Sequence, residues 1–112
     1  MQVSADKIDL GARAEEATRL LKLLANEKRL HILCELANHG EMSVTALSEA
    51  IDLGQSALSQ HLAKMRAEGL LAFRRDAQTL YYFVANEDAG RILMVLKDIF
   101  CDPPAAKQSK RN

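Results

Sequence analysis

The spacing of apolar residues changes once along this chain, and the change limits the folds that it can adopt. From about residue 17 to residue 68, apolar side chains recur every three or four positions, which is the repeat of one face of an α-helix. Between residues 71 and 84, two stretches rich in β-forming residues show alternation instead. The sequence therefore predicts a series of helices followed by a single β-hairpin.

Residues with known capping preferences divide the helical part into short helices. Asn26 and Ser43 are of the types that cap helix N-termini, and Gly40 and Gly69 are typical of helix ends. Asn86 is expected to cap a last helix with apolar residues nearly all around it, as in a helix that is buried or pairs with another chain. The predicted order is helix (about 17–24), helix (27–39), helix (44–51), turn (52–54), helix (55–68), strands (71–75 and 79–84) and helix (87–100).

The expected fold class is mainly α with a small β-hairpin, an α+β arrangement in one domain. A length of 112 residues is enough for one core but not for two domains. We expect residues 1–11 to form a mobile arm and residues 12–102 to form the domain. Residues 103–112 begin with two prolines and are expected to be a disordered basic tail.

Charge and composition exclude several classes of protein. Fifteen basic and fifteen acidic residues give a net charge of zero, so general electrostatic coating of nucleic acid is excluded. The charge is negative before residue 50 and slightly positive after it, so any surface for a polyanion is expected in the second half. No apolar run is long enough for a membrane helix, and the first residues do not resemble a signal peptide. We therefore expect a cytoplasmic protein with no membrane partner.

The helices predicted over 44–51 and 55–68, with a glycine-containing turn between them, form the pattern of a helix-turn-helix. Around the inward residue Leu58, the outer face of the second helix carries small polar side chains, which can enter a DNA major groove and bond base edges. The residues expected at base edges are Gln55, Ser56, Ser59 and Gln60.

The hairpin that follows can act as a wing that places cations beside the phosphate backbone. His61 lies nearer the packed face of its helix and is expected to reach a phosphate at most. The residues expected at the DNA backbone are Lys64, Arg74, Arg75 and Gln78. A helical pair used for protein contacts is the alternative that the pattern also allows.

Three segments of the chain resemble signature segments of the arsenic-repressor (ArsR) family of winged-helix regulators. They are residues 23–33 (LLANEKRLHIL), residues 53–62 (LGQSALSQHL), and the Gly69-Leu70 pair with residues 78–82 (QTLYY). The resemblance covers roughly residues 15–101. It implies a winged helix-turn-helix that forms a homodimer, largely through its first and last helices. It also implies binding to an imperfect inverted repeat in double-stranded promoter DNA of a bacterium, usually with repression.

Two cysteines are too few to stabilise a secreted protein of this size, so they are expected to be buried structure, a metal site or a redox switch. Cys34 lies on the inward face of the second helix, and Cys101 lies at the end of the last one. The pair resembles the dithiol branch of the family, of the biofilm growth-associated repressor and haemolysin-activator types. The resemblance implies that reactive sulfur species or oxidants join the two thiols by a disulfide or polysulfide bridge within one protomer. Such a bridge would tilt the helices and release DNA.

Other interpretations stay open at this point. Both cysteines can be inert core residues. The helix C-terminus, Asp98 and Asp102 disfavour the thiolate of Cys101, whereas Lys97 favours it. A regulator without thiol sensing would respond to a metal, or would activate by displacing another DNA-binding protein. The histidines and acidic residues do not have the spacing of a metal site, so we expect neither metal nor cofactor. No catalytic triad, phosphate loop or metal-hydrolase motif is present, and we expect no enzyme.

Overall fold

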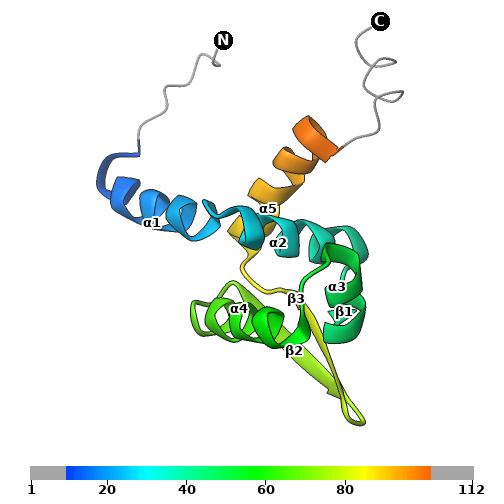
Figure 1. Cartoon of the computed structure of the whole chain (residues 1–112). Helices are drawn as coiled ribbons and strands as arrows, with labels where there is room; N and C mark the ends of the chain where they lie inside the picture. The colour runs from blue at the N-terminus through cyan, green and yellow to red at the C-terminus, as the bar shows by residue number, and fades with distance from the viewer. Residues whose placement is uncertain (1–9, 102–112) are drawn as a thin grey trace, which may run out of the picture.

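Residues 10–101 are described by a computed structural model of the chain, with the backbone alone described at Cys101. Helices make up most of this part, and a small antiparallel sheet completes it (Figure 1). In chain order the elements are η1 (Gly11–Arg13), α1 (Ala14–Leu24), α2 (Glu27–His39), β1 (Met42–Ser43), α3 (Val44–Ile51), α4 (Gln55–Ala67), β2 (Leu71–Asp76), β3 (Thr79–Val84), α5 (Glu87–Leu96) and η2 (Lys97–Cys101). Residues 1–9 of the predicted arm and the whole predicted tail lie outside the described residues.

The predicted starts of α2, α3 and α5 are confirmed by capping contacts, whereas α1 begins at Ala14, three residues before its predicted start. The side chains of Asn26, Ser43 and Asn86 each accept a hydrogen bond from the backbone N–H three residues later, at 3.0, 3.1 and 2.8 Å. Gly40 and Gly69 both have φ of 83°, a conformation that glycine adopts without steric cost, and they follow the last residues of α2 and α4. Local sequence signals therefore set where these helices begin and end.

The predicted hairpin is confirmed, and a third strand joins it. β2 and β3 pair from Leu71 opposite Val84 to Asp76 opposite Thr79, so β2 is one residue longer than predicted. β1 pairs antiparallel with β3 on its other side, which gives the strand order β1-β3-β2. No sequence pattern indicates β1, because two residues are too few to show an alternating pattern.

The last helix differs from the prediction in its final turn. α5 ends at Leu96, and residues 97–101 form the π-helical turn η2 instead of continuing the α-helix. Apolar spacing does not distinguish these two backbone patterns, because both keep apolar side chains on nearby faces. On α5, Ala89 and Leu93 are buried, whereas the apolar side chains of Met94 and Val95 are more than half exposed.

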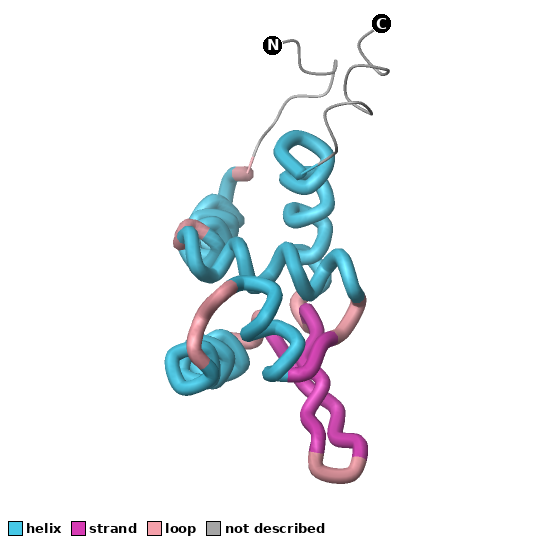
Figure 2. The backbone as a smooth tube through the Cα atoms, turned by 45° about the vertical axis from the view of Figure 1, so that its right-hand side comes forward, coloured by secondary structure: helices cyan, strands magenta, loops and turns pink. Residues whose placement is uncertain are grey.

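One core joins the helices to the sheet. Its buried residues are Leu24, Ile32, Leu33, Leu36, Met42, Leu47, Ile51, Leu58, Leu62, Met65, Leu70, Leu71, Tyr82, Ala89 and Leu93. Among the described residues no polar or charged residue is buried. In Figure 2 the β2–β3 hairpin projects from one end of the helical body, and the end of α5 projects from the other.

Candidate nucleic-acid interface

The helix-turn-helix is built by α3, α4 and the turn between them. Asp52 takes the left-handed conformation in this turn, with φ and ψ both 52°. The Ser48 hydroxyl donates a hydrogen bond to the Leu53 carbonyl, and the Leu53 N–H donates to the Ser48 carbonyl at 3.3 Å. Gly54 has φ of −58° and open space where a Cβ would stand, so the turn does not require glycine there. Ser48, which no sequence pattern marks, therefore helps to fix the angle between the two helices.

The predicted division of α4 into an inward and an outward face is confirmed. Leu58, Leu62 and Met65 are fully buried. His61 is half-buried, as its place beside this inward face predicts. The residues of α4 that were predicted to contact DNA and that are exposed are Gln55, Ser56, Ser59, Gln60 and Lys64. The core thus fixes the rotation of α4 and leaves these five side chains on the surface.

A polar recess lies between the helix-turn-helix and the wing. Its lining residues are Ser43, Val44, Thr45, Gln55, Ser59, Gln78, Thr79 and Leu80. The recess brings together members of both predicted sets, Gln55 and Ser59 of the base-edge set on α4 and Gln78 of the DNA-backbone set at the tip of the hairpin. The Gln55 amide donates to the Thr45 hydroxyl of α3 at 3.4 Å. Lys64 lies elsewhere, in a depression between the ends of α1 and α4 and the start of α2.

Arg74 of the wing is held by a carboxylate from another part of the chain. Its Nε and Nη2 atoms donate to both carboxylate oxygens of Glu41, at 2.6–3.0 Å, and its guanidinium lies over the Tyr81 ring at 4.6 Å from the centroid. These hydrogen bonds lower the pKa of Glu41 below its ordinary value, so the pair persists at mildly acidic pH. Arg74 and Glu41 are 51% and 37% exposed, so their contact remains open to solvent and to a ligand.

Arg75 and the hairpin tip have different surroundings. Successive strand residues point to opposite faces of a sheet, so Arg75 projects away from the face that carries Arg74. Arg75 is exposed, and the described residues contain no ion-pair partner for it. The tip is the two-residue turn of Ala77 and Gln78, in which Ala77 has φ of 57°. Gln78 is thereby exposed beside the polar recess.

Aromatic residues join the wing to the end of α4, a contact that no sequence pattern indicates. The Arg66 guanidinium of α4 lies over the Phe73 ring of β2, at 4.4 Å from the centroid. Phe73 also packs edge-on against Tyr82, with ring centroids 5.4 Å apart. The register of the hairpin sets Phe73 opposite Tyr82, a pairing that sequence alone gives once the turn length is known.

The two cysteines lie on α2, which packs against both β3 and α5, and at the end of η2. Cys34 is half-buried on α2 and packs against the core, as its apolar spacing predicted. Cys101 ends η2, and its side chain lies outside what the structure describes. Within residues 10–101, no three histidine, cysteine or acidic side chains gather in the manner of a metal site. In the same range no helix is both long and apolar enough to cross a membrane.

Comparison with known proteins agrees with this architecture. Residues 26–72 match the family described as bacterial regulatory protein, arsR family. The chain is 47% identical over 97 residues to nodulation protein NolR of Rhizobium meliloti, which covers 87% of this chain and 79% of NolR. It is 42% identical over 91 residues to the biofilm growth-associated repressor of Agrobacterium fabrum, covering 81% of this chain and 77% of that protein. The crystal structure of the transcriptional regulator HlyU from Vibrio vulnificus superposes with a TM-score of 0.78 and 43% identity, over 82% of this chain and 95% of that one. The chain belongs to the arsR family of bacterial regulatory proteins, and it is a winged-helix, DNA-binding transcriptional regulator and not an enzyme.

Proposed function

We propose that this regulator is a homodimeric repressor that leaves its promoter when reactive sulfur species or oxidants join Cys34 to Cys101. The observation that carries the proposal is the packing of α2, which holds Cys34, directly against α5, which leads into the turn that ends at Cys101. A covalent bridge between Cys34 and Cys101 therefore changes the positions of α2 and α5 together. The relative named biofilm growth-associated repressor supports repression as the sign of regulation.

The proposed DNA contacts follow the arrangement of exposed side chains. Gln55, Ser56, Ser59 and Gln60 contact base edges from α4, because an exposed helix face of small polar residues fits a major groove. Lys64, Arg75 and Gln78 contact the DNA backbone, with smaller contributions from Arg74 and His61. Two copies related by a two-fold axis read an imperfect inverted repeat in promoter DNA.

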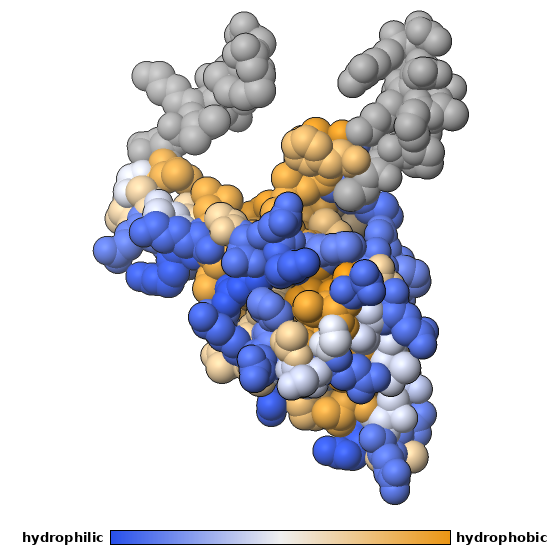
Figure 3. Space-filling model, viewed as in Figure 1, coloured by the Kyte–Doolittle hydropathy of each residue, from blue (hydrophilic) through white to orange (hydrophobic). Residues whose placement is uncertain are grey.

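A second copy of the chain is proposed to cover the apolar surface of α1 and α5. Side chains that are apolar and more than half exposed lie on these two helices and their flanking turns: Leu10, Leu21, Met94, Val95, Ile99 and Phe100. Figure 3 shows hydrophobic surface along α1 and over the projecting end of α5. Exposed apolar surface of this kind is typical of protein–protein contact.

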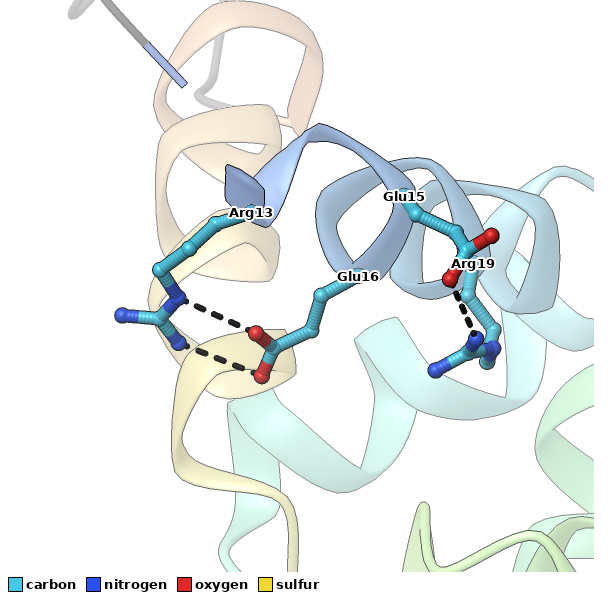
Figure 4. A network of polar contacts seen from close by, with 4 residues as sticks. All are labelled: Arg13, Glu15, Glu16 and Arg19. Carbon is cyan, nitrogen blue, oxygen red and sulfur yellow. Dashed lines mark hydrogen bonds and ion pairs between the residues drawn. The ribbon is translucent and has the colours of Figure 1, made fainter. Parts of the chain in front are cut away.

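Two ion pairs lie at the start of α1. Arg13 pairs with Glu16 through two hydrogen bonds, at 3.0 and 3.1 Å, and Arg19 pairs with Glu15 at 3.6 Å (Figure 4). These pairs are exposed and contribute little to stability. Arg13 and Arg19 thus each have a carboxylate partner, so neither brings an unpaired charge to a second copy of the chain.

The proposed switch is a thiol–disulfide exchange with an organic persulfide as oxidant. One cysteine thiolate attacks the outer sulfur of the persulfide, takes up that sulfur and releases the organic thiol. The second cysteine thiolate then attacks the inner sulfur of the protein persulfide, which forms the disulfide and expels the outer sulfur as hydrogen sulfide. Two thiols and one persulfide thus yield one disulfide, one organic thiol and one hydrogen sulfide. With a second equivalent of persulfide, the second cysteine also takes up a sulfur. Its outer sulfur then attacks the inner sulfur of the first protein persulfide, which gives a trisulfide and hydrogen sulfide.

The test uses Cys34→Ser and Cys101→Ser with the wild type as reference. Reduced wild type and both variants are expected to bind the same promoter duplex with similar affinity. After persulfide treatment, the wild type is expected to lose two hydrogens, or to gain bridging sulfur, by intact mass and to release the duplex, whereas both variants stay bound. Wild-type thiols that remain unmodified while binding is unchanged would refute the switch and leave DNA binding intact. Titration with zinc or copper then tests a metal-responsive regulator.

The two wing arginines are expected to differ in their contribution to DNA affinity. Arg75→Ala is expected to weaken binding to all sequences alike and to reduce the salt slope of the binding constant by about one unit. Arg74→Ala is expected to reduce the slope by less, because Glu41 already neutralises Arg74. The measurement is a binding titration at several salt concentrations between about 50 and 200 mM. Equal loss of slope in the two variants would contradict the assigned effect of Glu41.

A further inference from the structure

A nearly buried ion pair joins the start of α2 to the end of α4. The Arg29 Nη2 atom lies 2.7 Å from the Oε1 atom of Glu68, and the two side chains are 11% and 26% exposed. Glu68 is the C-cap residue of α4, directly after the last turn of the recognition helix. The other ion pairs of the described residues are more exposed at one or both partners. This pair is therefore screened least by solvent.

The same guanidinium also holds the end of α1. The Arg29 Nη1 atom donates to the Leu23 carbonyl at 2.9 Å. Carbonyls in the last turn of a helix have no partner within that helix, so they need one from outside. The neighbouring carbonyls of Lys22 and Leu24 are satisfied by the backbone N–H groups of Ala25 and Asn26. The Leu23 carbonyl accepts its hydrogen bond from Arg29. Arg29, on α2, therefore contacts both α1 and the end of α4.

The Glu68 carboxylate depends on this contact. Its Oε1 atom is buried, and apart from the short approach of Arg29 it has no hydrogen bond of good geometry. A buried carboxylate that loses its cation costs more than an exposed one, because water cannot replace the lost partner. Lys64, one turn earlier on α4, lines the same depression as Arg29 and Glu68. The contact thus lies beside a side chain assigned to the DNA backbone.

We propose that Arg29 and Glu68 are positioning residues that set the direction of α4 relative to α1. The core fixes the rotation of α4 through its inward side chains, and Leu24 of α1 is buried in the same core. Arg29 adds a directional polar contact between the ends of these two helices, and the planar fork of its guanidinium holds both partners in one geometry. The inference rests on the proposed dimer, in which α1 lies at the interface. Its consequence is that Arg29 sets the separation of the two recognition helices.

The experiment compares full operators with half-sites. A duplex is first selected from a random library by the wild-type protein, and versions are then made with one base pair added to or removed from its centre, together with a single half-site. Arg29→Lys and Glu68→Gln are expected to lower affinity for the selected operator by about tenfold, within the usual range of coupling between sites. We expect half-site affinity to change by less than about twofold, because the base-contacting side chains are unaltered. We also expect the preference for spacing to relax or shift.

Lys28→Gln is the matched control for loss of charge, because it removes a positive charge from an exposed position of α2 next to Arg29. The double variant Arg29→Gln with Glu68→Gln is expected to lose no more than Arg29→Gln alone, since the two residues act as one unit. Equal loss on full and half sites, with unchanged spacing preference, would overturn the proposal and leave the pair a stabilising contact only. A wild type that occupies half-sites but never an inverted repeat would instead overturn the proposed dimer.

Discussion

Replacing Val95 with glutamate is expected to convert the dimer into a monomer and to weaken binding to an inverted-repeat operator by about 10²- to 10⁴-fold. Val95 is 58% exposed on α5, and three further apolar side chains beside it and one turn later are also more than half exposed. In a dimer that covers this surface, a carboxylate would lose its hydration without gaining a partner. The loss of the second recognition helix would then remove the effective concentration that binding of two half-sites provides.

The oligomeric state is measured by light scattering after gel filtration, and affinity by titration with the operator and with a half-site. Asn38→Glu is the control, since it adds the same charge at an exposed position of α2. We expect Val95→Glu to keep its half-site affinity, because α4 and the wing are untouched. A variant that stays dimeric with full operator affinity would show that the interface does not use this face of α5.

Local sequence signals were sufficient for most of the fold and for the surface of α4. Asn26, Ser43 and Asn86 cap the helices that they were predicted to cap. The three- and four-residue spacing identified Leu58 and Leu62 as buried, which placed the polar residues between them on the outside. These predictions succeeded because each depends on residues within one or two turns.

Contacts between distant segments were not predictable in the same way. Glu41 binds Arg74 and Arg29 binds Glu68 across more than thirty residues of sequence, and no local pattern marks either pair. The sequence accordingly predicts Arg74 as a contact from its charge alone and gives no sign of its carboxylate partner. The first strand, β1, was missed for the same reason, because two residues acquire strand geometry only by pairing with β3.

Leu62→Ala is expected to lower the free energy of unfolding by about 2–5 kcal/mol, which is a large part of the stability of a small domain. Leu62 is fully buried in the middle of the inward face of α4. Its removal leaves a cavity between the recognition helix and the core, and neighbouring side chains can fill such a cavity only in part. Ser59→Ala, one turn earlier on the outer face, is expected to change stability by less than about 0.5 kcal/mol.

Urea unfolding followed by circular dichroism measures both effects, at equal protein concentration because a dimer's stability depends on concentration. The same variants then separate folding from recognition. Leu62→Ala, studied where it is folded, is expected to keep its preference among operator sequences, since the outward side chains are intact. Ser59→Ala is expected to relax that preference without loss of stability. A destabilisation by Ser59→Ala as large as that of Leu62→Ala would contradict the two-faced character of α4, because an exposed hydroxyl has no packing to lose.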